Sequence, residues 1–153
     1  MNILVSACLL GTCCRYDGNN NKVHTLSNLS EGCHLIPVCP EQLGGLPTPR
    51  VPAERRHHRV YTKEGLDVTK EFTQGAEEAL KLAKQFDCKL AILKERSPSC
   101  GKGMIYDGSF QKRLIEGNGL TTDLLIKNGI EVIGESMIET YFHLGSKEEK
   151  KPM

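Results

Sequence analysis

The stretch "KLAILKERSPSCG", residues 89–101, decides the fold class and raises the question of function. Its first six residues carry an apolar run that fits a strand covered on both faces of a sheet. That strand leads directly into a cysteine held between serine, proline and glycine. A cysteine that only packs in a core needs no such surroundings, whereas one presented to a ligand does. Cys100 is therefore the first candidate site residue.

The segments around this strand follow the order strand, loop, strand, helix, strand, helix, strand, helix. Strands are predicted at residues 2–7, 34–41, 89–94 and 130–135, and helices at residues 120–129 and 135–145. A further helix, with Thr69 as its N-cap, carries on one face Phe72, Ala76, Ala79, Leu80 and Ala83. Residues 42–68 and 103–119 are rich in turn residues and are expected to be loops, with room for a small hairpin in the first. The order predicts an α/β fold: a three-layer, Rossmann-like open sheet that is mostly parallel.

Length and charge narrow the possible functions. The 153 residues predict a single α/β domain over residues 1–145 and a flexible tail over 146–153. The net charge of +1 gives no general attraction to polyanions. The apolar start carries no Lys or Arg before its short hydrophobic run, so neither a signal peptide nor a membrane span is expected. We expect a cytoplasmic protein, and the sequence leaves its oligomeric state open.

Seven cysteines, at positions 8, 13, 14, 33, 39, 88 and 100, are the main chemical signal. They form no CxxC pair, so any metal site must be gathered from distant segments. Cys8, Cys39 and Cys100 each lie at or just past the carboxyl end of a predicted strand, and ligands of open parallel sheets bind beyond those ends. Cys13 and Cys14 are close enough in sequence to join them. We interpret Cys33 and Cys88 as structural.

Three thiolates on one rim suit a soft metal centre, either zinc or an iron–sulfur cluster. Three ligands around a four-iron cluster would leave one iron open, which favours Lewis-acid catalysis. Three other interpretations stay open at this point. The cysteines could form a zinc- or cluster-binding interaction module, or a thiol redox or persulfide carrier that uses the Cys13–Cys14 pair or Cys100. They could also be incidental core residues, because free cysteine often behaves as a small hydrophobe.

Five segments extend these motifs well beyond single residues. They are "VSACLLGTCCRYDG", "PVCPEQLGGLPTPRVPAE", "GLDVTKEFTQGA", "AILKERSPSCGKGMIYDGSF" and "GNGLTTDLLIKNGIEV". Together, and in this order, they resemble the domain-of-unknown-function family 523, over about residues 2–135. Characterised members of that family act as thiouracil desulfidases.

The resemblance implies an oxygen-sensitive 4Fe-4S cluster and a thiolated pyrimidine as substrate. In the family, the thiocarbonyl sulfur binds the open iron, water adds at the carbon, and sulfur leaves as sulfide without net electron transfer. Motif by motif, the implied ligands are Cys8, Cys39 and Cys100. Cys14, in "CRYDG", also matches a family motif, and it is the alternative for one of the three ligands.

The same resemblance places three polar residues at the reaction. Glu41 follows the ligand Cys39 by two residues, so it is expected to move the protons of the attacking water. Ser97 and Ser99 are expected to hydrogen-bond the substrate or position the water. A solvated loop carboxylate and turn-forming serines are the alternatives for these positions.

Two loop segments complete the expected site. Arg15, Tyr16 and Asp17 either line the pocket or hold its loop, and "LGGLPTPR" is expected to cover the cluster with Arg50 tying it down. The basic run "RRHHR", residues 55–59, is expected to be a solvated loop, since nucleic-acid footprints involve broader basic patches. Nucleic acid is therefore not the favoured partner, although a thiolated nucleotide or RNA stays open as a substrate.

Overall fold

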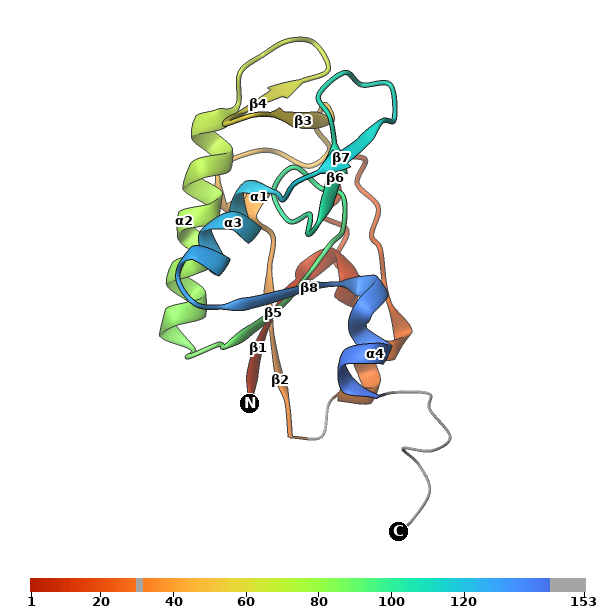
Figure 1. Ribbon diagram of the computed structural model, residues 1–153, viewed down its shortest axis with the longest axis vertical. Helices are drawn as coiled ribbons and strands as arrows, with labels where there is room; N and C mark the ends of the chain where they lie inside the picture. Colours follow the sequence, from red (N-terminus) through yellow and green to blue (C-terminus); the bar gives the residue numbers. More distant parts are fainter. Residues whose placement is uncertain (30–31, 144–153) are drawn as a thin grey trace.

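A four-stranded sheet forms the centre of the molecule. The computed structural model describes residues 1–29 and 32–143. The sheet contains β1 (Asn2–Ser6), β2 (His34–Val38), β5 (Leu90–Leu93) and β8 (Glu131–Gly134), in the order β2-β1-β5-β8. All its pairings are parallel, so the carboxyl ends of the strands share one edge (Figure 1). The predicted α/β fold with a mostly parallel sheet is confirmed.

Helices cover both faces of this sheet and give the expected three layers. On one face, α2 (Thr69–Gln85) and α3 (Leu120–Lys127) pack Ala79, Ala83 and Leu125 against Leu4 and Ala91. The small side chains let the long helix lie close to the strands. The other face is covered by the turns η1 (Ala7–Leu10) and η2 (His24–Leu29), and by η3 (Glu135–Met137) and α4 (Ile138–Phe142) (Figure 1).

Some element boundaries differ from the predicted ones. The helix α2 begins at Thr69, but the predicted N-cap was wrong, because the Thr69 hydroxyl accepts a hydrogen bond from the Val60 amide instead. The carboxylate of Asp67 accepts from the Thr69 amide in its place. β2 lies at the edge of the sheet, where Pro37 is tolerated. The helix predicted over residues 120–129 ends at Lys127, and the tail predicted over residues 146–153 lies outside the described residues.

Two antiparallel hairpins stand beyond the carboxyl ends of the sheet. One pairs β3 (Ala53–Arg56) with β4 (Arg59–Thr62), and the other pairs β6 (Met104–Tyr106) with β7 (Leu114–Glu116) (Figure 1). The first is the small hairpin expected within residues 42–68. The second lies in residues 103–119, where only turns were expected.

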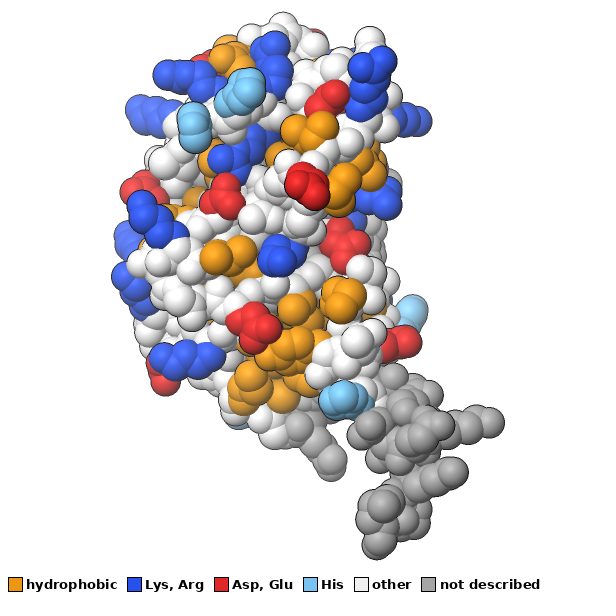
Figure 2. Space-filling view, in the orientation of Figure 1, with side chains coloured by type: hydrophobic (Ala, Val, Ile, Leu, Met, Phe, Trp, Pro, Cys, Tyr) orange, Lys and Arg blue, Asp and Glu red, His pale blue; other side chains and the backbone are white. Residues whose placement is uncertain are grey.

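The run "RRHHR" is mostly exposed, as expected, but it forms the ends of β3 and β4 and the turn between them and not an open loop. Arg55 lies in β3, and its side chain bonds the Asn118 carbonyl at 2.6 Å and Asp123 at 2.7 Å. Arg56 stacks on the Tyr61 ring at 4.2 Å from its centroid. Lys, Arg and His side chains gather at this end of the molecule (Figure 2). Among the described residues, no helix is long and apolar enough to cross a membrane.

Candidate functional site

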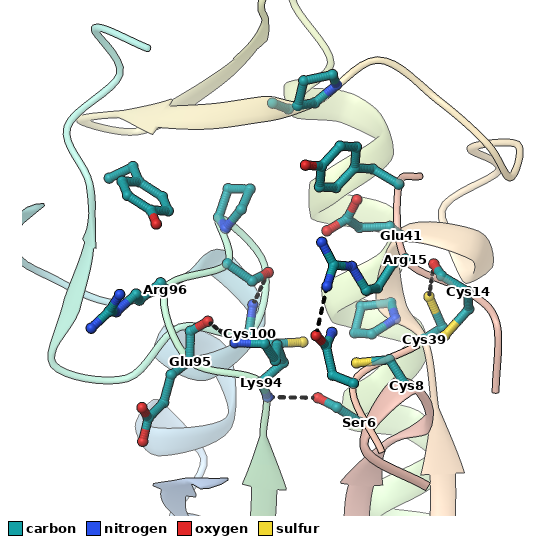
Figure 3. Close-up of a pocket in the computed structure, with 18 of the residues that line it drawn as sticks. Ser6, Cys8, Cys14, Arg15, Cys39, Glu41, Lys94, Glu95, Arg96 and Cys100 are labelled. Atoms are coloured by element: carbon teal, nitrogen blue, oxygen red, sulfur yellow. Dashed lines mark hydrogen bonds between the residues drawn. The ribbon is translucent and has the colours of Figure 1, made fainter. Parts of the chain in front are cut away.

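A cavity of about 510 Å³ opens between the strand ends and the two hairpins. Four cysteines line it, namely Cys8, Cys14, Cys39 and Cys100. Figure 3 shows Cys100 on one side of this space and the other three sulfurs on the opposite side. The two cysteines interpreted as structural lie elsewhere: Cys88 is buried in the core under α2, and Cys33 packs against the opposite core. Their position at strand ends predicted three of the four cysteines that share the cavity, and Cys14 is the alternative that joins them.

Close packing of α1 (Pro40–Leu43) on α2 fixes Cys39 and Glu41. Cys39 precedes α1, and Glu41 lies in its first turn. A Cβ added at Gly75, in α2, would lie 1.9 Å from the Pro40 carbonyl oxygen, which no side chain tolerates. Gly75 is therefore required for the two backbones to approach this closely. The contact sets the position of Cys39 and Glu41 relative to the sheet.

Hydrogen bonds within its own loop hold Cys100. The Ser97 hydroxyl accepts from the amides of Ser99 and Cys100, each at 3.0 Å. Ser97 lines the cavity, whereas Ser99 does not. The Ser99 side chain is buried, and its hydroxyl bonds the Thr121 hydroxyl at 2.8 Å. The two serines therefore have different surroundings, which their similar sequence context did not indicate.

Hydrogen bonds with the start of α3 also hold the Cys100 loop. The amides of Leu120 and Thr121, which lack partners within the helix, donate to the carbonyls of Pro98 and Ser99 at 2.9 and 2.8 Å. The Thr122 hydroxyl donates to the Cys100 carbonyl at 2.8 Å. Cys100 is thus presented from a loop that is hydrogen-bonded on both sides.

The Cys14 thiol links two of the other cysteines. Its hydrogen bonds are the largest influence on Cys8 and Cys39, and they lower the pKa of each thiol from 9.0 to about 7. The same bonds raise the pKa of Cys14 itself. Burial raises the pKa of Cys100, so this thiol needs a nearby cation before it ionises. These opposite shifts favour ionisation of the Cys8 and Cys39 thiols over that of Cys14.

Glu41 is the acidic residue nearest in sequence to the cysteines of the cavity, and it lines the cavity (Figure 3). Its side chain is 18% exposed, and Oε1 accepts a hydrogen bond from Arg50 Nε at 2.9 Å. Burial raises the pKa of Glu41, and the charge of Arg50 opposes that shift. The carboxylate is thus not the solvated loop group of the alternative interpretation.

Arg50 holds its loop as expected, but this loop is not the cavity cover. Its guanidinium reaches the carbonyls of Pro47 and Cys14, and residues 44–50 do not line the cavity. Arg15 and Tyr16 do line it, and Arg15 bonds Asn21 at 2.8 Å.

The two hairpins form the actual roof, which sequence reasoning missed. Glu54 of β3 accepts hydrogen bonds from the amides of Gly108 and Phe110 at 3.0 and 3.1 Å, and so joins one hairpin to the other. Tyr106 and Phe110 of the second hairpin line the cavity with Lys112. The alternation in "MIYDGSFQKRLIE" could have indicated a hairpin, but nothing local places it over the cysteines.

The cavity wall carries more cations than carboxylates. Five cationic residues line it, against three carboxylates, which are Glu41, Glu54 and Glu95. The cations are Arg15, Lys63, Lys94, Arg96 and Lys112. Lys94 is neutralised by Glu135 at 2.9 Å, whereas Lys63, Arg96 and Lys112 are exposed side chains with no ion pair among the described residues. The mouth of the cavity is therefore positively charged.

The donor set fits a cluster better than a single ion. Among the described residues, no group of three or more Cys, His, Asp or Glu side chains is placed to hold one metal ion. A zinc ion requires all its thiolates about 2.3 Å from one point. The thiolates of an iron–sulfur cluster lie farther apart, because each binds a different iron. Thiols on opposite sides of one cavity suit the second arrangement.

Comparison with known proteins agrees with this chemistry. The model of the 2-thiouracil desulfurase family matches residues 3–137. The uncharacterised protein YbbK of Bacillus subtilis (strain 168) is 40% identical over 144 residues, which cover 88% of this chain and 95% of YbbK. A solved structure, the 4Fe-4S-dependent thiouracil desulfidase TudS, is 48% identical with a TM-score of 0.87, and the match covers 91% of this chain and 93% of TudS. Because the family model spans nearly all of the described fold, including every cysteine of the cavity, the chain belongs to the 2-thiouracil desulfurase family.

Proposed function

We propose that the protein removes sulfur from a thiolated pyrimidine such as 2-thiouracil, with a 4Fe-4S cluster as cofactor. Water replaces sulfur, so the products are the oxo pyrimidine and sulfide, and no electrons are transferred overall. The observation that carries this proposal is the shared cavity of Cys8, Cys39 and Cys100. Family membership and the likeness to TudS support it. All seven cysteines are free thiols, which suits a reducing cytoplasm.

We assign Cys8, Cys39 and Cys100 as the cluster ligands. When bound, the cluster supplies an open iron that acts as a soft Lewis acid and prefers a thiocarbonyl sulfur to a carbonyl oxygen. Cys14 is the less suitable ligand, because its contacts with Cys8 and Cys39 raise the pKa of its own thiol and so disfavour the thiolate that binds iron. The cavity of about 510 Å³ is within the usual range for a small-molecule site.

Glu41 is the proposed general base. It faces the cavity, and a partly buried carboxylate with a raised pKa accepts a proton more readily than an exposed one.

Ser97 is the stronger of the two serine candidates for a substrate contact, because it lines the cavity and its hydroxyl oxygen already accepts hydrogen bonds from two amides. Its own hydrogen is available to a substrate. Ser99 becomes a candidate only if its bond to Thr121 opens.

The positive cavity mouth favours a second substrate class. Lys63, Arg96 and Lys112 have no ion-pair partner among the described residues, and they come from both hairpins and the loop after β5. Such a rim attracts an anionic substituent. A thiolated pyrimidine nucleotide would place its phosphate there, with the base over the cysteines.

Purification without oxygen tests the proposal. We expect a brown protein with about four irons and four sulfides per chain, which releases sulfide and uracil from 2-thiouracil. The air-bleached protein is the control and should release neither product. A colourless zinc protein, or one that holds its iron but does not release sulfide from the base or its nucleotide, would contradict the proposal. Transfer of sulfur to a protein thiol in place of sulfide release would support the persulfide carrier.

A further inference from the structure

Arg50 is a buried cation behind the cavity, and its side chain is 7% exposed. Its Nε donates to Glu41 Oε1 at 2.9 Å, and Nη2 donates to the Cys14 carbonyl at 2.9 Å. Nη1 donates to the Thr48 hydroxyl at 2.9 Å and to the Pro47 carbonyl at 3.1 Å. One guanidinium therefore joins the proposed base, a cysteine segment of the cavity wall and its own loop.

The contact with Glu41 is selective for one oxygen. Among the described residues, no hydrogen bond or ion pair reaches Oε2 of Glu41. Glu41 lines the cavity, and Arg50 does not. Arg50 thus holds the carboxylate from the side away from the substrate and leaves the second oxygen free.

We propose that Arg50 is a positioning residue that orients Glu41 Oε2 toward the attacking water. The proposal rests on the function proposed above. A glutamate side chain has several rotatable bonds, and misplacing a catalytic group by about 1 Å can cost ~10²-fold in rate. The Arg50 backbone amide donates to the Tyr16 carbonyl at 2.7 Å, which fixes the backbone from which the guanidinium extends.

Lysine cannot replace this arrangement. The guanidinium is a rigid planar fork whose donors point in fixed directions, whereas an ammonium is a compact point charge on a flexible stem. Arg50→Lys therefore keeps the positive charge but loses the simultaneous contacts with Glu41, Cys14 and Thr48. The variant therefore shows whether the reaction needs the orientation of the Glu41 carboxylate or only a positive charge at position 50.

The test compares Arg50→Lys with Arg59→Lys in the cluster-loaded protein. Arg59 pairs with Asp67 on the outside of the first hairpin and does not line the cavity, so it is the matched control. We expect both variants to keep the parental iron content and the parental dissociation constant for 2-thiouracil, measured by absorbance titration. In Arg50→Lys, kcat should fall ~10–100-fold, the usual cost of losing an orienting partner. In Arg59→Lys, kcat should be unchanged.

A double-mutant cycle with Glu41→Gln shows whether Arg50 acts through Glu41. If it does, Arg50→Lys adds little once Glu41 is already Gln, because the group it orients is gone. Effects on kcat that multiply would overturn the proposal, as would parental kcat in Arg50→Lys. Loss of iron from Arg50→Lys would also overturn it, because the arginine would then support the cluster site.

A crystal structure of Arg50→Lys gives a result that does not depend on activity. We expect the Glu41 carboxylate to be displaced or to occupy more than one conformer. Glu41 in its parental position would overturn the proposal even if the parent protein proved inactive. Inactivity of an iron-loaded parent would instead contradict the proposed function, so the two failures are distinguishable.

Discussion

The floor and the roof of the cavity are built in different ways. The floor consists of the strand ends, η1, α1 and the Cys100 loop, and its cysteines Cys8, Cys14 and Cys100 are buried. The roof consists of the two hairpins (Figure 1), and its cations Lys63 and Lys112 are exposed. The floor is held by backbone hydrogen bonds and close backbone packing, whereas Glu54 joins the two roof hairpins through two amides.

This difference matches the two tasks of the site. Metal ligands must be held in a fixed geometry, and the hydrogen bonds and close packing around the floor cysteines provide this. Substrate selection can instead rely on more exposed segments that a rigid scaffold positions. We therefore expect changes in the floor to remove the cluster or the chemistry, and changes in the roof to alter substrate binding alone.

The largest effect is expected from Cys100→Ser, which removes a floor thiolate. Iron per chain should fall to near zero after anaerobic reconstitution, because a hydroxyl does not replace a thiolate as an iron ligand. Cys88→Ser is the matched control, since Cys88 is buried in the core away from the cavity, and it should keep its iron. Equal iron loss in both variants would mean that folding, and not ligation, was disturbed.

Glu41→Gln should remove the chemistry and leave the cluster in place. The amide keeps the shape of the side chain but accepts no proton, so kcat should fall ~10²–10⁴-fold. Iron content and binding of 2-thiouracil should stay at parental values in the same preparation. Near-parental sulfide release would show that another group, or bulk water, takes the proton.

Gly75→Ala disturbs the packing of the cavity floor without changing any cysteine. Its Cβ would meet the Pro40 carbonyl at 1.9 Å, so α1 must move and carry Cys39 with it. Overpacking of this kind costs ~1–3 kcal/mol of unfolding free energy, whereas helix propensity alone would favour Ala by about 1 kcal/mol. Chemical denaturation and iron content measure the outcome. The exposed neighbour Gln74→Ala should change neither, and a stabilised Gly75→Ala would show that α1 adapts freely.

The smallest effect is expected from Glu54→Ala, which releases one roof hairpin from the other. Both amide bonds to Gly108 and Phe110 are lost, while no floor contact changes. KM for 2-thiouracil should rise about tenfold, equivalent to ~1.4 kcal/mol, with iron content unchanged. Glu64→Ala, at an exposed position in the turn just after β4, is the control. A loss of iron from Glu54→Ala would contradict the expectation that changes in the roof alter substrate binding alone.

Local sequence patterns were sufficient for the sheet and for three of the four cysteines that line the cavity. The apolar run of residues 89–94 indicated a buried strand, and the carboxyl ends of parallel strands meet at one edge. Cys8, Cys39 and Cys100 therefore had to lie near one another once the α/β order was recognised. The roles of Glu41 and Ser97 came from resemblance to the family, and the structure adds that both line the cavity.

By itself, the sequence determined the parallel sheet and the thiols at its edge, because both follow from periodicity and strand order. The tertiary structure alone decided which groups surround those thiols. Glu54 and the Gly108 amide are 54 positions apart, and Arg55 and the Asn118 carbonyl are 63 apart. The different surroundings of Ser97 and Ser99, and the contact of Gly75 with Pro40, likewise depend on how α3 and α1 pack. No local pattern encodes such contacts, because each depends on where two distant segments meet after the sheet has formed.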